Sequence, residues 1–186
     1  MPLHNLPEEA LAAELAPPTG APSAAVLRDL IRDCTSHGDL YVARDAHGGH
    51  GLFAAAALPM HAFIGEYVGT IQRGHGCDAS ESSDYLMKYP DGNGGRYICG
   101  KASGSLPRFA NHSAVGTREC NSAMFCVLCD GTWHQIMMTT RVVEAREELR
   151  HDYGQEFWSK EHRAEGLIAG DPLPHSEARS HEVEVR

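Results

Sequence analysis

The sequence predicts a mainly β domain that carries only a few short helices. Beyond residue 39, short runs of apolar, β-branched and aromatic residues are separated by glycines and polar turns, which is the pattern of short strands. The 186 residues are 42% hydrophobic and 22% charged, so the chain can bury a core without disulfides or structural metals. At this length we expect one domain with flanking segments.

The N-terminal flank, residues 1–38, is expected to hold short helices and a proline-rich linker. Alanines and glutamates favour a helix over residues 8–15, and five prolines among the first 22 residues keep the linker out of helix. From Ala24 to Asp33 the apolar residues recur at helical spacing, with Ser23 available as the N-cap. This second segment predicts an amphipathic helix.

The domain itself, residues 39–158, is expected to consist of short strands. The segments with a strand pattern are 40–43, 51–54, 62–68, 97–99, 124–129 and 135–140. Asp130-Gly131, between the last two, is a residue pair typical of a tight hairpin turn. The C-terminal flank, 159–186, is charged and then broken by glycine and proline, so we expect it to be partly disordered.

The net charge of −9 bears on the class of partner. A protein that binds nucleic acid by neutralising phosphates is expected to be basic, so direct binding of DNA or RNA is disfavoured. An acidic surface suits a basic protein or peptide, although the charge could equally serve solubility alone. No apolar run approaches the roughly 20 residues that span a bilayer, and no secretory signal pattern is present. We therefore expect an intracellular protein without a membrane partner, in either nucleus or cytoplasm.

The six cysteines are scattered, and only Cys126 and Cys129 have a C-x-x-C spacing. Cys120 and His134 could complete a zinc site in principle, because zinc takes four converging ligands. However, the pair lies in a predicted strand, where cysteine packs as a small apolar residue. We favour buried, reduced thiols and expect no metal.

Four stretches carry residues suited to chemistry, and they occur in a definite order. They are Gly48-Gly49-His50-Gly51-Leu52-Phe53-Ala54, Phe63-Ile64-Gly65-Glu66-Tyr67-Val68-Gly69-Thr70-Ile71, Arg108-Phe109-Ala110-Asn111-His112-Ser113 with Cys120-Asn121 after it, and Glu147-Glu148-Leu149-Arg150-His151-Asp152-Tyr153-Gly154. Singly, each could be a turn or a strand with a polar end. In this order, from about residue 40 to 158, they resemble the SET-domain family of protein lysine methyltransferases, and the third is most similar to histone-methylating members.

The resemblance implies a fold of several short sheets with a threaded, knot-like C-terminal segment. It also implies a reaction in which the methyl group of S-adenosylmethionine passes to a lysine amine, on a basic protein such as a histone. No covalent enzyme intermediate is needed, so the lack of a Ser/Cys–His pair is no objection. The enzyme's work is to align donor and acceptor, to exclude water and to help discharge the lysine.

The resemblance assigns a cofactor site to three parts of the chain. Gly49, His50 and Gly51, through their backbones, and Asn111, through its side chain, would bind the amino-acid end of the cofactor. His112 would meet the adenine through its backbone. Phe157 or Trp158 would cover the adenine and close the channel, with simple core packing as an equal alternative.

The resemblance also assigns the lysine channel. Tyr153 matches the catalytic tyrosine whose hydroxyl orients the lysine nitrogen; an unperturbed tyrosine, with a pKa of about 10, is a poor general base. Tyr67 and Tyr85 would line the channel, unless they are ordinary core aromatics. His151 stands where the family commonly has Phe or Tyr, so we expect it to influence the number of methyl groups added. With an ordinary pKa of about 6.5, its protonation is expected to lower activity below neutral pH.

Some family features are missing. There is no cysteine after Cys129, Ala114 follows the N-H-S triplet where a cysteine is usual, and Arg146 replaces the usual glycine before Glu147. The segment 114–119 is also longer than usual. These departures leave a non-catalytic SET-like module that binds a peptide or partner as the alternative to an enzyme.

Overall fold

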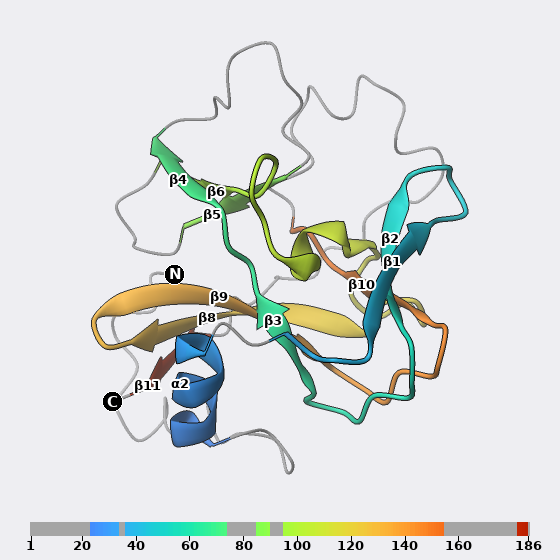
Figure 1. The fold of residues 1–186 in the computed structure, drawn as a ribbon, viewed down its shortest axis with the longest axis horizontal. Helices are drawn as coiled ribbons and strands as arrows, with labels where there is room; N and C mark the ends of the chain where they lie inside the picture. The colour runs from blue at the N-terminus through green and yellow to red at the C-terminus, as the bar shows by residue number, and fades with distance from the viewer. Residues whose placement is uncertain (1–22, 34–35, 74–84, 90–94, 155–181, 186) are drawn as a thin grey trace.

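The computed structural model describes residues 23–33, 36–73, 85–89, 95–154 and 182–185, and these form a mainly β fold (Figure 1). The described strands make three small sheets, accompanied by one α-helix and a short 3₁₀-helix, Leu106–Phe109. The predicted fold class is therefore confirmed. No helix among these residues is long and apolar enough to cross a membrane.

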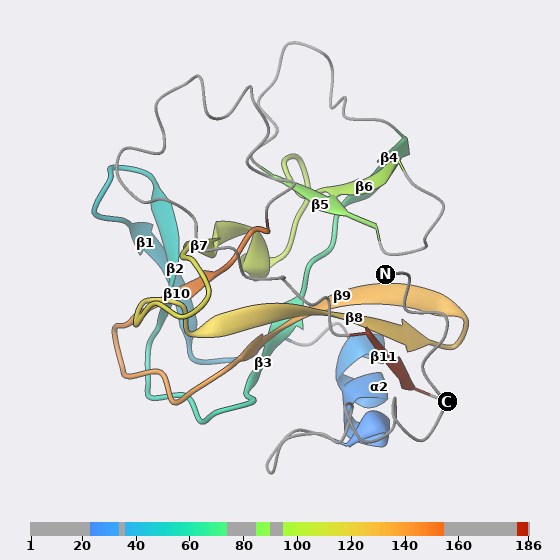
Figure 2. The same ribbon diagram turned by 180° about the vertical axis from the view of Figure 1, so that it is seen from behind.

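In the first sheet, an interior strand comes from the C-terminal part of the domain. Its order is β1 (Leu40–Arg44), β2 (His50–Ala54), β10 (Glu148–His151) and β7 (Asn111–His112). β10 runs antiparallel to β2 and parallel to β7, so a strand from the end of the domain lies between two strands that precede it in the chain. This placement brings the third and fourth sequence motifs side by side (Figure 2).

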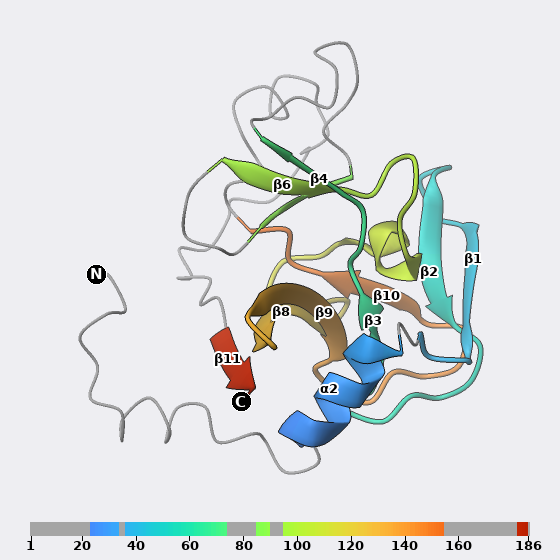
Figure 3. The ribbon, with the colours of Figure 1, turned by 60° about the vertical axis from the view of Figure 1, so that its left-hand side comes forward.

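The second sheet contains the predicted hairpin. Its order is β11 (Glu182–Val185), β8 (Ser122–Cys129), β9 (Thr132–Thr139) and β3 (Phe63–Glu66). Asp130 and Gly131 join β8 to β9 with positive φ angles of 50° and 76°, as a tight turn between twisted strands requires. β11 pairs in parallel with β8 at the sheet edge (Figure 3).

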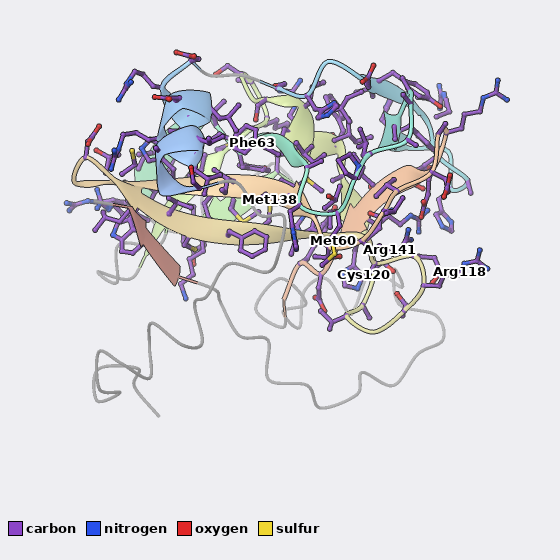
Figure 4. All side chains as sticks on the ribbon, turned by 90° about the horizontal axis from the view of Figure 1, so that it is seen from below. Met60, Phe63, Arg118, Cys120, Met138 and Arg141 are labelled. Atoms are coloured by element: carbon purple, nitrogen blue, oxygen red, sulfur yellow. The ribbon has the colours of Figure 1, made fainter. Side chains whose placement is uncertain are left out.

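The predicted helix over 24–33 is confirmed as α2 (Ala24–Arg32). The Ser23 hydroxyl accepts a hydrogen bond from the backbone N–H of Val26 at 3.4 Å, which satisfies one donor of the first turn. The buried Leu27 and Ile31 pack with residues of the second sheet that include Phe63 and Met138, both beside the helix in Figure 4. Burial of this apolar stripe holds the helix to the sheet.

A second cluster of buried apolar side chains joins the first sheet to the opposite face of the second. Its largest fully buried members are Leu52, Leu58, Ile64, Met137, Val143 and Leu149. The third sheet has the strand order β4 (Thr70–Arg73), β6 (Arg96–Cys99) and β5 (Leu86–Lys88). Its first strand, β4, follows β3 in the chain.

Several elements differ from the sequence prediction. The strands β4, β5, β7, β10 and β11 were not predicted, because they are two to four residues long and carry charged or exposed residues among their apolar ones. β9 begins at Thr132, three residues before the predicted start. The helix predicted over 8–15, the residues Phe157 and Trp158, and most of the flank expected to be partly disordered lie outside the described residues.

A polar network fixes the start of β10. Asn121, fully buried, donates to the Glu148 carbonyl at 2.8 Å and accepts from the Arg150 N–H at 3.0 Å, so its amide substitutes for a neighbouring strand. Glu147 receives two hydrogen bonds from Arg141. Arg141 also donates to the carbonyl oxygen of Arg118, and the two arginines are labelled in Figure 4. Glu147 is thereby held directly before β10.

Replacing Glu147 by glutamine is expected to lower the free energy of unfolding by about 1–3 kcal/mol at neutral pH, because hydrogen bonds to a charged group are lost. The hydrogen bonds from Arg141, acting against burial, lower the pKa of the Glu147 carboxyl to about 2. A carboxyl with a lowered folded-state pKa stabilises the fold above its ordinary value of 4.5. The difference between wild type and variant should therefore shrink as the pH falls from 4.5 towards 2 in urea titrations. A difference that is the same at every pH would contradict this role.

Candidate active site

The glycine turn between β1 and β2 is organised by Asp45. Its Oδ1 atom accepts hydrogen bonds from the backbone N–H groups of His47 and Gly49, each at 2.8 Å. Burial acts to raise the pKa of this carboxyl, but these N–H donors and the Asn111 amide outweigh it and lower the pKa. The Asp45 carboxylate is therefore an ionised, fixed part of the turn.

Asn111 lies against this turn, at the point where β7 meets β10. Its Nδ2 atom is 3.0 Å from Asp45 Oδ2, 2.8 Å from Glu148 Oε1 and 3.3 Å from the His50 carbonyl oxygen. Glu148 is held in turn by Arg150, whose Nε and Nη2 atoms donate to Oε2 at 2.9 and 2.5 Å. Asp45 and Glu148, which the sequence analysis did not assign to the site, thus surround a residue that it did assign.

The side chain of His112 lies against Tyr153. Its Nδ1 atom accepts the Tyr153 N–H at 3.2 Å, which requires an unprotonated nitrogen. Burial lowers the pKa of His112, with Asp152 opposing and Arg150 assisting, in agreement with that role. Because the Ser113 N–H binds the His151 carbonyl and β7 is the last strand of its sheet, the backbone groups of His112 point away from β10.

Tyr153 follows β10 and turns its hydroxyl towards the backbone before Asn111. The hydroxyl donates to the Ala110 carbonyl oxygen at 2.8 Å. The ring centroids of His112 and His151 lie 5.4 and 5.0 Å from that of Tyr153. The hydroxyl and the Ala110 carbonyl therefore form a fixed polar pair among aromatic rings.

His151 is on the same side of the chain as Tyr153, as an extended segment predicts. Its side chain is buried, with a relative exposure of 3%. The Nδ1 atom is 3.1 Å from the Asp152 carbonyl oxygen, so Nδ1 carries the proton and Nε2 can only accept a hydrogen bond. Burial lowers the pKa of His151 to about 4.

This lowered pKa corrects the expectation that protonation of His151 reduces activity just below neutral pH. The buried ring stays neutral until the solution is far more acidic, because a protonated imidazole at this position would lack the hydration that stabilises its charge in water. The sequence suggested the ordinary value, since burial cannot be read from the residues on either side.

Tyr67 comes from the end of β3 and is buried. Its hydroxyl donates to the Tyr85 carbonyl at 2.7 Å, and a Cβ at Gly100 would lie 3.1 Å from the hydroxyl oxygen. Burial and the neighbouring Tyr153 raise the pKa of Tyr67, so its proton stays in the hydrogen bond. Gly69, two residues on, has no room for a side chain because a Cβ would collide with the Cys99 carbonyl.

The structure thus brings together nine of the residues assigned from the sequence, around β2, β7 and the end of β10. They are Gly49, His50, Gly51, Asn111, His112, His151, Tyr153, Tyr67 and Tyr85. The contribution of Tyr85 to the Tyr67 hydrogen bond is its carbonyl oxygen. Phe157 and Trp158 lie outside the described residues.

The four residues considered as zinc ligands do not converge. Cys126 and Cys129 are three residues apart on strand β8 and so point to opposite faces. Cys120 lies before the other end of that strand, and the strand from Ser122 to Cys126 alone spans roughly 13 Å. His134 is hydrogen-bonded to Glu66 at 2.7 Å. Within the described part of the chain, no three His, Cys, Asp or Glu side chains are grouped as metal ligands.

We expect the purified protein to carry no stoichiometric zinc and to keep its melting temperature in strong chelator, because its core is closed by apolar packing. Elemental analysis with thermal unfolding in the presence of chelator checks this. One or more zinc atoms per chain, or a large loss of stability, would contradict the expectation.

Comparison with known proteins agrees with this geometry. The SET domain family model matches residues 49–154, more than half of the chain, and the chain belongs to the SET domain family. Human Histone-lysine N-methyltransferase EHMT1 is 31% identical over 139 residues, covering 72% of this chain and 10% of that protein. Human Histone-lysine N-methyltransferase 2D is 29% identical over 134 residues, covering 67% of this chain and 2% of that one. The chain therefore spans about a tenth or less of these relatives.

Solved structures show the same fold. The crystal structure of ATXR5 in complex with histone H3.1 matches with a TM-score of 0.57 and 19% identity, over 81% of this chain and 67% of that chain. A second structure, of the ATXR5 SET domain with histone H3, has a TM-score of 0.58 and 19% identity, over 73% and 68% of the two chains.

Proposed function

We propose that this chain is an S-adenosylmethionine-dependent protein-lysine N-methyltransferase. The observation that carries the proposal is that Tyr153, His151 and Tyr67 lie close together, next to Asn111 and its carboxylate partners, in a chain of the SET domain family. Two sites meet there, one suited to a zwitterionic cofactor and one to an amine. The domain we assign to this function is residues 39–158.

The chemistry of the residues fits S-adenosylmethionine. Its amino-acid end carries an ammonium and a carboxylate, and Asn111 lies between the carboxylates of Asp45 and Glu148 in the glycine turn. By resemblance to the family, the adenine would lie against the backbone of His112, whose N–H and C=O point away from β10. When bound, the cofactor supplies a methyl group on a cationic sulfonium.

The residues of the channel orient the lysine amine. To accept the methyl group that a bound cofactor would supply, the lysine amine would need to have lost one proton and to lie in line with the methyl–sulfur bond. The Tyr153 hydroxyl and the Ala110 carbonyl oxygen are the fixed polar atoms that would hold the amine. Tyr67, buried near Tyr153, would line the channel beside them. Such preorganised oxygens stabilise positive charge as it passes from sulfur to nitrogen.

A basic protein is the substrate class that this chain suits. The net charge is −9, and the relatives named above are histone-lysine N-methyltransferases. ATXR5, a structural neighbour, was solved in complex with histone H3.1. We therefore include a histone tail as the first candidate, with an intracellular location, nuclear or cytoplasmic, and with neither nucleic acid nor membrane as a direct partner.

The alternative is a SET-like module that binds a peptide without turnover. Calorimetric titration with S-adenosylmethionine separates the two, since a module without catalysis has no need of the cofactor. Transfer of a radiolabelled methyl group, screened against histones and a whole lysate, then identifies the substrate. Tight cofactor binding with labelled protein supports the enzyme, and a folded protein that neither binds nor transfers contradicts it.

The His151→Phe variant is expected to shift products towards trimethyllysine. The wild-type Nε2 atom can accept a hydrogen bond from water or from an amine N–H, which restricts rotation of a methylated amine. Phenylalanine removes that acceptor, so the amine can turn and react again, whereas wild type should give mainly mono- and dimethyllysine. Mass spectrometry of a methylated peptide measures the distribution.

His151→Tyr is the matched control, because it has the ring size of phenylalanine and restores a polar group. It should keep the lower methylation states. Folding lowers the pKa of His151 from 6.5 to about 4. The wild-type free energy of unfolding should therefore decrease as the pH falls from 6.5 towards 4, and it should decrease less in His151→Phe. Identical product distributions in all three proteins would rule out this role for His151.

A further inference from the structure

The orientation of the Asn111 amide is set by its neighbours. Its nitrogen faces two carboxylate oxygens, at 3.0 Å in Asp45 and 2.8 Å in Glu148. If the amide were turned over, its Oδ1 atom would face both carboxylates without a proton between them. The two carboxylates therefore direct Oδ1 away from themselves, as a hydrogen-bond acceptor at the edge of the site.

The carboxylates are themselves held before any ligand arrives. Asp45 is fixed by the backbone N–H groups of the glycine turn, and Glu148 by the two-pronged contact with Arg150. The Glu148 side chain is only 12% exposed. The arrangement costs little reorganisation when a ligand binds.

The two glycines of the turn make room for these carboxylates. A Cβ at Gly51 would lie 2.6 Å from Glu148 Oε1, and a Cβ at Gly49 would lie 2.9 Å from Asp45 Oδ2. The glycines are thus needed so that both acidic side chains can reach Asn111. This is a separate requirement from close approach of the backbone to a ligand.

We propose that Asp45 and Glu148 are positioning residues that hold the Asn111 amide with Oδ1 towards the ligand and make this corner selective for an ammonium group. This inference rests on the proposed function, since the ammonium would be the α-amino group of the cofactor. An outward amide oxygen backed by two carboxylates accepts hydrogen bonds from a cation. A ligand without the amino group would leave these acceptors unpaired, which is costly.

The test compares two ligands by calorimetry on the full chain. They are S-adenosylhomocysteine and its analogue in which hydrogen replaces the α-amino group. We expect the wild type to prefer the amino ligand by roughly 10- to 100-fold, the usual range for a hydrogen bond to a charged group. Asp45→Asn and Glu148→Gln should each reduce that preference several-fold, while binding of the deaminated ligand changes little.

Glu144→Gln is the control, because Glu144 is an exposed carboxylate in the turn before β10 and its loss changes the net charge equally. It should leave the preference unchanged. Equal losses for both ligands in the Asp45 and Glu148 variants would show a purely structural role and overturn the inference. A wild type that binds both ligands equally would overturn it as well, while leaving the proposed function intact. A folded wild type that binds neither ligand would contradict both.

Discussion

Tyr153→Phe is expected to remove most methyl transfer, by roughly 100-fold or more, while the protein stays folded and continues to bind the cofactor. The lost hydroxyl donates to the Ala110 carbonyl at 2.8 Å, and this polar pair is what we expect to hold the lysine amine in line. The ring keeps its contacts with the rings of His112 and His151, so packing changes little. Initial rates of methyl transfer at saturating peptide and cofactor measure the effect.

The Ala110 carbonyl loses its hydroxyl donor in this variant, which costs about 1 kcal/mol of stability. A fall of a few degrees in melting temperature is therefore expected. Tyr41→Phe is the matched control, since Tyr41 lies on β1, is 37% exposed and stacks on Phe53. It should transfer methyl groups at the wild-type rate. A Tyr153→Phe variant with that same rate would make Tyr153 a structural residue and favour the non-catalytic module.

Asn111→Ala is expected to weaken binding of S-adenosylmethionine by about one to two orders of magnitude. Hydrogen bonds between a charged group and a neutral partner contribute about 1.5–3 kcal/mol, and every 1.4 kcal/mol is tenfold in affinity. The variant also leaves Asp45 and Glu148 facing each other without the amide that separates them. Isothermal calorimetry on the purified variant gives the change in dissociation constant.

The two variants are expected to fail in opposite ways, and each serves as the control for the other. Tyr153→Phe should bind the cofactor and transfer little, whereas Asn111→Ala should bind it weakly. Circular dichroism and thermal unfolding establish that both are folded. Unchanged cofactor affinity in folded Asn111→Ala would remove Asn111 from the site.

The parts of the fold that sequence could predict are those specified by neighbouring residues. Ser23 and the apolar spacing after it define α2, and Asp130-Gly131 defines the turn between β8 and β9. The strands β7 and β10 are different, because each is formed through pairing with residues distant in sequence. Glu148 and Arg150 in β10 have no strand pattern of their own, and their positions depend on the pairing.

The site shows the same limit. The ordered motifs identified Asn111, His112 and Tyr153 because their residue types and spacing resemble a family. Asp45 was missed because it contacts Asn111 across 66 positions of sequence, and nothing in its local turn indicates that contact. Ala110 was missed because it acts through a carbonyl oxygen, which every residue possesses.

Mass spectrometry of a mixture of histone tail peptides incubated with S-adenosylmethionine tests the central claim most directly, when wild type and Tyr153→Phe are compared. We predict that the wild type adds the mass of one or two methyl groups to a lysine side chain and that the variant leaves the same peptide almost unmodified. A folded wild type that binds S-adenosylmethionine yet methylates neither these peptides nor any protein of a whole lysate, or a variant that methylates as fast as wild type, would contradict the account.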